Sequence, residues 1–168
     1  MLKNMTIVLK NKARLIIDDF IFKCSIGKKG LVKNKIEGDK KTPIGTFSLG
    51  NLFYRKDRHS KPLTKLKCIP IKKDMVWCDD IKNKKNYNKL LKINKNTKYE
   101  KLFRKDYKYD FMIPINYNTK KPKVGKGSAI FIHLTRKFKP TLGCVALEKK
   151  DFLILLKLID KNTKIKII

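Results

Sequence analysis

Short blocks of β-favouring residues, separated by turn residues, constrain the fold of this chain more than any other feature of its sequence. Between residues 6 and 27 the blocks are residues 6–9, 15–17 and 20–22. Asn11-Lys12 and Asp18-Asp19 interrupt them. Val, Ile and Phe favour strands whereas Asn and Asp favour turns, so this segment predicts consecutive antiparallel strands.

Turn formers dominate the next part of the chain and allow only short strands between loops. They are Gly27, Gly30, Gly38, Pro43, Gly45 and Gly50. Residues 51–100 are rich in Lys, Asn and Asp with scattered aromatic residues, and we expect long loops or short helices lying on a sheet.

The C-terminal third has the clearest periodicity. Apolar density at residues 109–115 and 129–134 predicts two more strands. Residues 164–168 alternate Lys and Ile until the last residue, as in a half-buried terminal strand. Between them, Phe152, Leu155, Leu156 and Ile159 have helical spacing. The predicted fold class is α+β and mostly β: an antiparallel sheet assembly with a C-terminal helix packed on it, forming one domain over residues 1–168.

The chain is strongly basic, with 43 Lys and Arg against 14 Asp and Glu and a net charge of +29. Such a surface attracts polyanions, and nucleic acid, anionic lipid and acidic wall polymers all qualify. The lysines are spread over almost every segment, so general compositional bias explains them as well as a dedicated binding site does. We expect non-specific polyanion binding and no specific nucleic-acid partner.

The cysteines and the N-terminus exclude several classes of protein. Cys24, Cys68, Cys78 and Cys144 lack metal-binding spacing, so we expect no structural zinc. We expect no other cofactor either, because a thiol, an imidazole and backbone donors suffice for acyl transfer. The apolar run at residues 5–9 is too short for a signal peptide, and the longest apolar run, residues 152–156, is too short to span a membrane.

A histidine and a cysteine near the C-terminus form the candidate catalytic pair. His133 closes the predicted strand at residues 129–134, and Gly143-Cys144 follows after a short basic loop. A thiol nucleophile needs a base within hydrogen-bond reach, and the chain has only two histidines. Gly143 permits a sharp turn, Thr141 is suited to stabilise that turn, and a helix beginning near residue 149 or 150 would favour the thiolate.

Each of these residues also has a purely structural interpretation. A cysteine after a glycine is often a small buried residue, and a strand histidine often belongs to the core. His59 lies in a charged loop and is expected to be solvated. Trp77 and Cys78, beside Asp79 and Asp80, suggest an aromatic anchor with turn-capping carboxylates, and Asp39 suggests a turn residue.

The ordered motifs of this chain resemble the YkuD-type L,D-transpeptidases, in particular short members of that family. Residues 129–134 and 141–147 are similar to its signature, a strand histidine followed by Ser/Thr-x-Gly-Cys and a helix. Residues 38–47 resemble its Thr-Pro-x-Gly-x-Phe motif. Further matching pieces are residues 53–58, 77–80, 87–88, 109–112, 116–118 and 127–133, and the resemblance covers about residues 15–158.

The resemblance implies a β-sandwich and an enzyme that forms a thioester at Cys144 with His133 as proton acceptor, while Thr141 and Gly143 support the oxyanion turn. Its substrate would be a peptidoglycan stem peptide, transferred to an amine as a 3-3 cross-link or to water. Many members carry a histidine before the Gly-Cys pair and an arginine or asparagine two residues after the cysteine. Here Leu142 and Ala146 occupy those positions.

Two other functions remain open from the sequence. One is a basic polyanion-binding module without catalysis, and the other is a thiol amidase acting on cell-wall fragments. The substrate implies a cell-envelope or periplasmic location, although no signal peptide is visible and a cytoplasmic role on wall precursors stays open.

Overall fold

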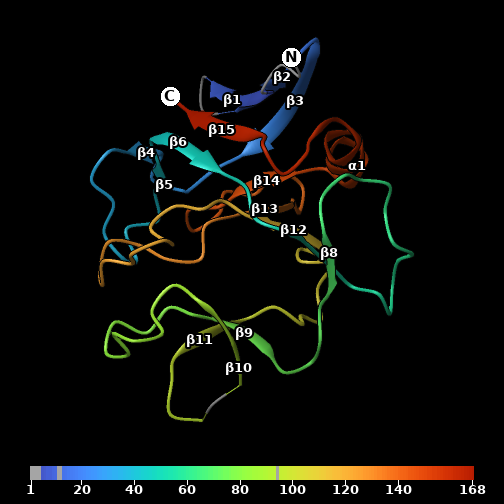
Figure 1. Ribbon diagram of the computed structural model, residues 1–168. Coiled ribbons are helices and arrows are strands. Elements are labelled where there is room, and N and C mark those ends of the chain that lie inside the picture. Colours follow the sequence, from blue (N-terminus) through green and yellow to red (C-terminus); the bar gives the residue numbers. More distant parts are fainter. Residues whose placement is uncertain (1–4, 11–12, 94) are drawn as a thin grey trace.

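The computed structural model describes residues 5–10, 13–93 and 95–168, which form a β-rich fold with one helix in the described part (Figure 1). The helix is α1 (Lys149–Leu158). The strands are β1 (Thr6–Lys10), β2 (Arg14–Ile17), β3 (Phe20–Ser25), β4 (Leu31–Val32), β5 (Thr42–Pro43), β6 (Gly45–Ser48), β7 (Leu52–Tyr54), β8 (Cys68–Pro70), β9 (Met75–Cys78), β10 (Leu90–Lys92), β11 (Tyr99–Lys101), β12 (Phe111–Pro114), β13 (Phe131–Leu134), β14 (Val145–Leu147) and β15 (Lys164–Ile167).

A curled ten-stranded sheet forms the body of the molecule, in the order β6-β15-β1-β2-β3-β14-β13-β12-β7-β8. The predicted antiparallel strands at the N-terminus are confirmed as β1, β2 and β3. Most other neighbours are also antiparallel, but β1 and β15, β13 and β14, and β7 and β8 pair in parallel. Parallel pairing requires crossover connections, which residue patterns do not reveal.

The C-terminal elements match their predicted periodicities. Phe152, Leu155 and Leu156 are buried on one side of α1, and the rings of Phe152 and Phe111 lie 6.1 Å apart. In β15 the isoleucines are buried and the lysines exposed, as their alternation predicts. The helix therefore closes one side of the main core, and β15 returns the chain to pair with β1 and β6.

The middle of the chain departs from the prediction. Of the two alternatives expected for residues 51–100, long loops form and no helix does among the described residues, but the strands there were not predicted. Instead β9 pairs with β10 and β11 in a separate three-stranded sheet, visible below the main sheet in Figure 1. The β-favouring residues 75–78 lie at its centre, and Trp77 is buried there with its Nε1–H bonded to Asn88 Oδ1 at 2.8 Å.

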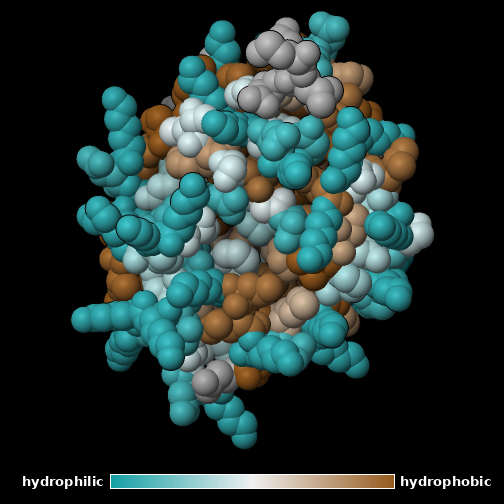
Figure 2. Space-filling view, in the orientation of Figure 1, coloured by the Kyte–Doolittle hydropathy of each residue, from teal (hydrophilic) through white to brown (hydrophobic). Residues whose placement is uncertain are grey.

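The surface is hydrophilic around almost the whole outline seen in Figure 2, with a hydrophobic area near the middle of that face. Hydrophilic side chains therefore do not gather in one patch of this view. Within the described residues, no helix is long and apolar enough to cross a membrane.

We expect Phe152→Ala to destabilise the fold by about 3–5 kcal/mol, because it removes a fully buried ring between helix and sheet. Lys157→Ala on the exposed face of α1 is the matched control and should change the free energy of unfolding by less than about 0.5 kcal/mol. Urea denaturation measures both, and equal effects would contradict the packing of α1 on this core.

Candidate active site

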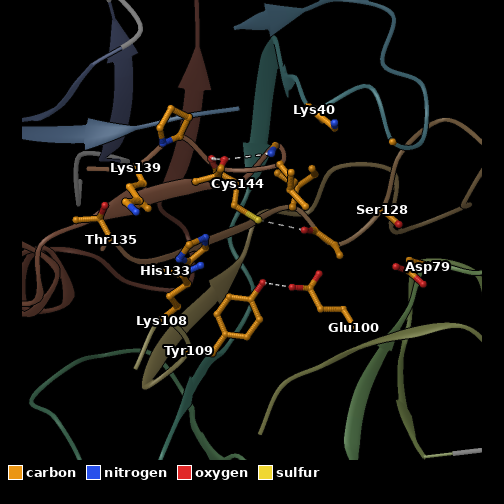
Figure 3. Close-up of a pocket in the computed structure, with 18 of the residues that line it drawn as sticks. Lys40, Asp79, Glu100, Lys108, Tyr109, Ser128, His133, Thr135, Lys139 and Cys144 are labelled. Atoms are coloured by element: carbon orange, nitrogen blue, oxygen red, sulfur yellow. Dashed lines mark hydrogen bonds between the residues drawn. The ribbon is translucent and has the colours of Figure 1, made fainter. Parts of the chain in front are cut away.

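The parallel pairing of β13 and β14 places His133 and Cys144 on the same side of the sheet. His133 is in register with Ala146, and Cys144 precedes Ala146 by two residues. Because side chains alternate along a strand, residues 144 and 146 share a face. Both His133 and Cys144 line one cavity of about 580 Å³, as the close-up in Figure 3 shows.

The cavity combines residues from distant parts of the chain. Tyr109 and Ala129 line it beside His133 and Cys144. Glu100 and Asp79 reach it from the neighbourhood of the three-stranded sheet. The loop before β5 supplies Lys35, Glu37 and Lys40, and the basic loop after β13 supplies Arg136 and Lys139. The small sheet therefore forms one wall of the cavity.

The Cys144 sulfur is held by the backbone of the neighbouring segment. Its thiol donates to the Ala129 carbonyl, and it accepts from the Phe131 N–H, both at 3.3 Å. The residue is 8% exposed. No hydrogen bond joins this sulfur to His133 in the described part of the chain, so the predicted bonding contact between the two side chains stays a prediction.

His133 presents one defined nitrogen for chemistry. Its Nδ1–H donates to the Leu134 carbonyl at 2.9 Å, which leaves Nε2 as the atom able to accept a proton. The Tyr109 ring and the His133 imidazole pack in a T-shaped arrangement, with ring centroids 5.2 Å apart. The Tyr109 hydroxyl in turn donates to Glu100.

Burial keeps both members of the pair uncharged. Burial, together with the Glu100 charge, raises the pKa of the Cys144 thiol to about 12, against the lowering effects of the Phe131 N–H and Lys35. Burial, together with the nearby Lys108 and Arg104 charges, lowers the pKa of His133 to about 4. At neutral pH the pair is therefore a thiol and a neutral imidazole.

The turn before Cys144 is fixed by two threonines. Thr141 Oγ1 donates to the Cys144 carbonyl at 2.6 Å and accepts from the Gly143 N–H at 3.1 Å. Thr42 Oγ1 donates to the Gly143 carbonyl at 2.8 Å and accepts from the Gly27 N–H at 2.9 Å. Gly143 has φ +146°, and a Cβ there would meet the Lys41 carbonyl oxygen at 3.0 Å, so glycine is required.

The helix dipole plays no part at the nucleophile, contrary to expectation. Three residues of β14 separate Cys144 from the first turn of α1. At about 3.3 Å per strand residue, the helix begins more than about 10 Å away, and the dipole effect fades within one turn.

Lys35 supports the same turn and was not predicted from the sequence. Its buried ammonium donates to Asp39 Oδ1 at 2.6 Å and to the Lys41 carbonyl at 2.8 Å. Asp39 is the predicted turn residue, since it also accepts the N–H groups of Ile36 and Lys41. A lysine in a lysine-rich loop gives no signal that it is the buried one.

The expectations for His59 and for the carboxylates Asp79 and Asp80 are met only in part. His59 is not simply solvated: its Nε2 lies 2.7 Å from Asp110 Oδ2 and its ring stacks near Phe111, away from the cavity. Asp80 caps a turn as expected, through the Lys82 and Lys98 N–H groups. Asp79 instead lines the cavity. No His, Cys, Asp or Glu group suited to a metal occurs among the described residues.

Comparisons with known proteins identify a family and a fold. The family model "YkuD: L,D-transpeptidase catalytic domain" matches residues 3–167. The crystal structure of the helical cell shape determining protein Pgp2 from Campylobacter jejuni aligns with a TM-score of 0.52 and 22% identity, covering 97% of this chain and 46% of that one. A single-residue mutant of Pgp2 aligns equally well. No curated protein sequence matches this chain.

Because the buried His133 imidazole is neutral, we expect the free energy of unfolding to fall at acidic pH. Because the pKa of His133 falls from 6.5 to about 4 on folding, its contribution to stability is present above pH 6.5 and is lost towards pH 4. The loss amounts to about 3 kcal/mol. Urea denaturation of wild type and His133→Gln between pH 7 and 4 measures it: the variant should show the smaller loss, and equal pH slopes would contradict the assignment.

Thr42→Val should remove two buried hydrogen bonds at the nucleophile turn and cost about 2–3 kcal/mol. Thr42→Ser keeps the hydroxyl and is the matched control, expected to cost less than half as much. Thermal or urea unfolding distinguishes them, and equal losses would show that the methyl group rather than the hydroxyl matters.

Proposed function

Because the chain belongs to the YkuD family of L,D-transpeptidase catalytic domains, we propose that Cys144 and His133 catalyse acyl transfer from peptidoglycan stem peptides. One observation carries this proposal: a thiol and an imidazole on paired strands open into the same cavity. A mixed polar and apolar cavity of about 580 Å³ has room for a short peptide.

The first half-reaction forms a thioester. The Cys144 sulfur attacks the carbonyl between residue three of a tetrapeptide stem and its terminal D-alanine, while His133 Nε2 accepts the thiol proton. The S–C bond forms, the C–N bond breaks, and the imidazolium returns its proton to the departing amine. Since both groups begin neutral, the imidazolium and the oxyanion develop together.

Backbone donors of the Thr141–Cys144 turn stabilise the developing oxyanion in this proposal. The Gly143 N–H now bonds to the Thr141 hydroxyl, which also donates to the Cys144 carbonyl. If the Gly143 N–H donated to the oxyanion in place of the Thr141 hydroxyl, it would supply one hydrogen bond that stabilises the negative charge. Thr141 is thus the residue that holds this donor ready.

The second half-reaction decides which product forms. An amine from a neighbouring stem gives a 3-3 cross-link, water gives an L,D-carboxypeptidase, and a cut at another amide bond of a wall fragment makes the protein a thiol amidase. Mass spectrometry of purified muropeptides incubated with the protein, with and without an added amine acceptor, distinguishes these three outcomes.

The wall substrate also implies a place of action in the cell envelope. The aligned structure is that of a helical cell shape determining protein, of which this chain spans less than half the length. We extend a role in cell-wall construction and cell shape to this protein on that basis, with the single catalytic domain as the active unit.

A second groove favours polyanion binding as an additional property. Its volume is about 520 Å³, and Lys33, Lys120, Lys121, Lys123 and Lys126 line it with the aromatic pair Phe47 and Tyr117. Cationic side chains beside aromatic rings are suited to acidic polymers. Polyanion binding that falls steeply with salt, is weakened by Lys121→Met and is equal in wild type and Lys139→Met would assign it to this groove rather than to the catalytic cavity.

Cys144→Ala should abolish the covalent adduct formed with a carbapenem or a tetrapeptide donor, because no other cysteine lines the cavity. His133→Gln should form it at least about a hundredfold more slowly. Intact-protein mass spectrometry measures both. Cys68→Ala is the matched control and should react as wild type does, so an adduct on Cys144→Ala that disappears in Cys68→Ala would overturn the assignment.

A further inference from the structure

The side-chain amide of Asn88 is buried and uses its full hydrogen-bonding capacity. Its Oδ1 accepts the Trp77 Nε1–H at 2.8 Å and the Ala129 N–H at 3.0 Å. Its Nδ2 donates to the carbonyls of Tyr117 and Asn118, at 3.0 Å and 2.7 Å. An amide side chain has two donor hydrogens and two acceptor lone pairs, so all four are occupied. One side chain therefore ties three separate segments together.

Asn88 is itself fixed to the three-stranded sheet. Its backbone N–H donates to the Cys78 carbonyl at 2.9 Å, and the Cys78 N–H donates to the Lys89 carbonyl at 2.9 Å. Asn88 has φ +57°, a left-handed conformation that asparagine adopts more readily than most residues do. The small sheet therefore presents the amide in one defined direction.

Ala129 receives this amide in an unusual backbone conformation. It has φ +52°, which costs free energy for an L-residue with a Cβ and needs support from its surroundings. Asn88 gives that support by accepting the Ala129 N–H. In this conformation the Ala129 carbonyl accepts the thiol of Cys144 at 3.3 Å, drawn as the dashed line at the sulfur in Figure 3.

The small sheet also holds the other contact of the sulfur. The Trp77 ring packs against Phe131 in a T-shaped arrangement, with ring centroids 5.1 Å apart. The Phe131 N–H donates to the Cys144 sulfur at 3.3 Å. Both hydrogen bonds of the sulfur thus come from residues 129–131, which the small sheet holds through Asn88 at one end and Trp77 at the other.

These contacts direct the thiol proton away from its expected acceptor. The proton lies on the bond to the Ala129 carbonyl, whereas the proposed reaction transfers it to His133 Nε2. Before that transfer the S–H···O bond to Ala129 must break, and an S–H···N bond to His133 must form. Rotation about the Cα–Cβ bond of Cys144 makes this exchange, since no other bond of the side chain moves the sulfur.

We propose that Asn88 is a positioning residue that holds the thiol of Cys144 in a resting orientation. It keeps Ala129 in the left-handed conformation, and this conformation aims the Ala129 carbonyl at the thiol proton. The nucleophile is released when the thiol exchanges this carbonyl for His133 Nε2. This inference rests on the proposed function for the role of Cys144, and it adds how the thiol is restrained when no substrate is bound.

The S–H stretching band in the infrared spectrum tests the resting orientation, because a hydrogen-bonded thiol absorbs at lower wavenumber than a free one. Subtracting the spectrum of Cys144→Ala isolates the Cys144 band from those of the other three cysteines. The wild-type band should be lowered. Asn88→Gly keeps a residue that tolerates positive φ but removes the amide, and it should shift the band to higher wavenumber.

The released thiol should also react faster with a small reagent. We expect iodoacetamide to alkylate Cys144 about three- to tenfold faster in Asn88→Gly than in wild type, as loss of one hydrogen bond implies. Both measurements are made at a temperature at which urea curves show each variant to be folded. Faster alkylation without a shift of the band would reflect general loosening and would overturn the proposal.

Asn118→Gly is the matched control. Asn118 also has a positive φ, +53°, and its side-chain amide bonds to the backbone of Lys123 and Gly127 but not to Ala129. This variant should keep both the band and the alkylation rate. Ala129→Gly adopts a positive φ without strain and should keep the lowered band, whereas Ala129→Val disfavours a positive φ and should raise it.

The wild-type band and Ala129→Val test the inference even where Asn88→Gly does not fold. A wild-type band at the position of a free thiol, or an unshifted band in Asn88→Gly or Ala129→Val, contradicts the proposal. A lowered band in a protein whose Cys144 forms no adduct with a carbapenem or a tetrapeptide donor overturns the proposed function instead.

Discussion

The parallel register of β13 with β14 is the constraint on which the candidate active site depends. It joins two segments through backbone hydrogen bonds. It leaves His133 and Cys144 on one face of the sheet, with Cys144 two residues before Ala146, the register partner of His133. The sheet fixes the backbone of His133 within β13, whereas Cys144 directly precedes β14 and is held by the turn that Thr141 and Thr42 fix. A shift of one residue in this register would direct one of the two side chains to the opposite face.

Burial explains why His133 and Cys144 are both uncharged in the absence of substrate. The same apolar surroundings that position Phe131 and Tyr109 also remove water from the sulfur and the imidazole, and this disfavours both charged forms. A neutral pair is less reactive than a thiolate and an imidazolium. Its advantage is that oxyanion and imidazolium arise only during attack, where fixed donors and dipoles stabilise them most.

The sequence predicted the elements whose patterns are local. The three N-terminal strands, α1 and β15 follow from alternation and helical spacing over a few residues, because one buried face dictates each pattern. The parallel pairs and the three-stranded sheet around Trp77 depend on contacts between distant segments and left no such signal. Cys144 and His133 were found through their chemistry and motif, whereas Lys35 and Asp79 resemble any other charged loop residue.

The few carboxylates of a chain with a net charge of +29 are informative because of where they lie. On the surface an Asp or Glu among many lysines gains favourable interactions at almost any position, so its location says little. Inside a cavity, Glu37, Asp79 and Glu100 repel one another and lose hydration, and both effects oppose folding. Glu100 in the cavity wall, rather than the basic exterior, therefore sets part of the electrostatic environment of Cys144.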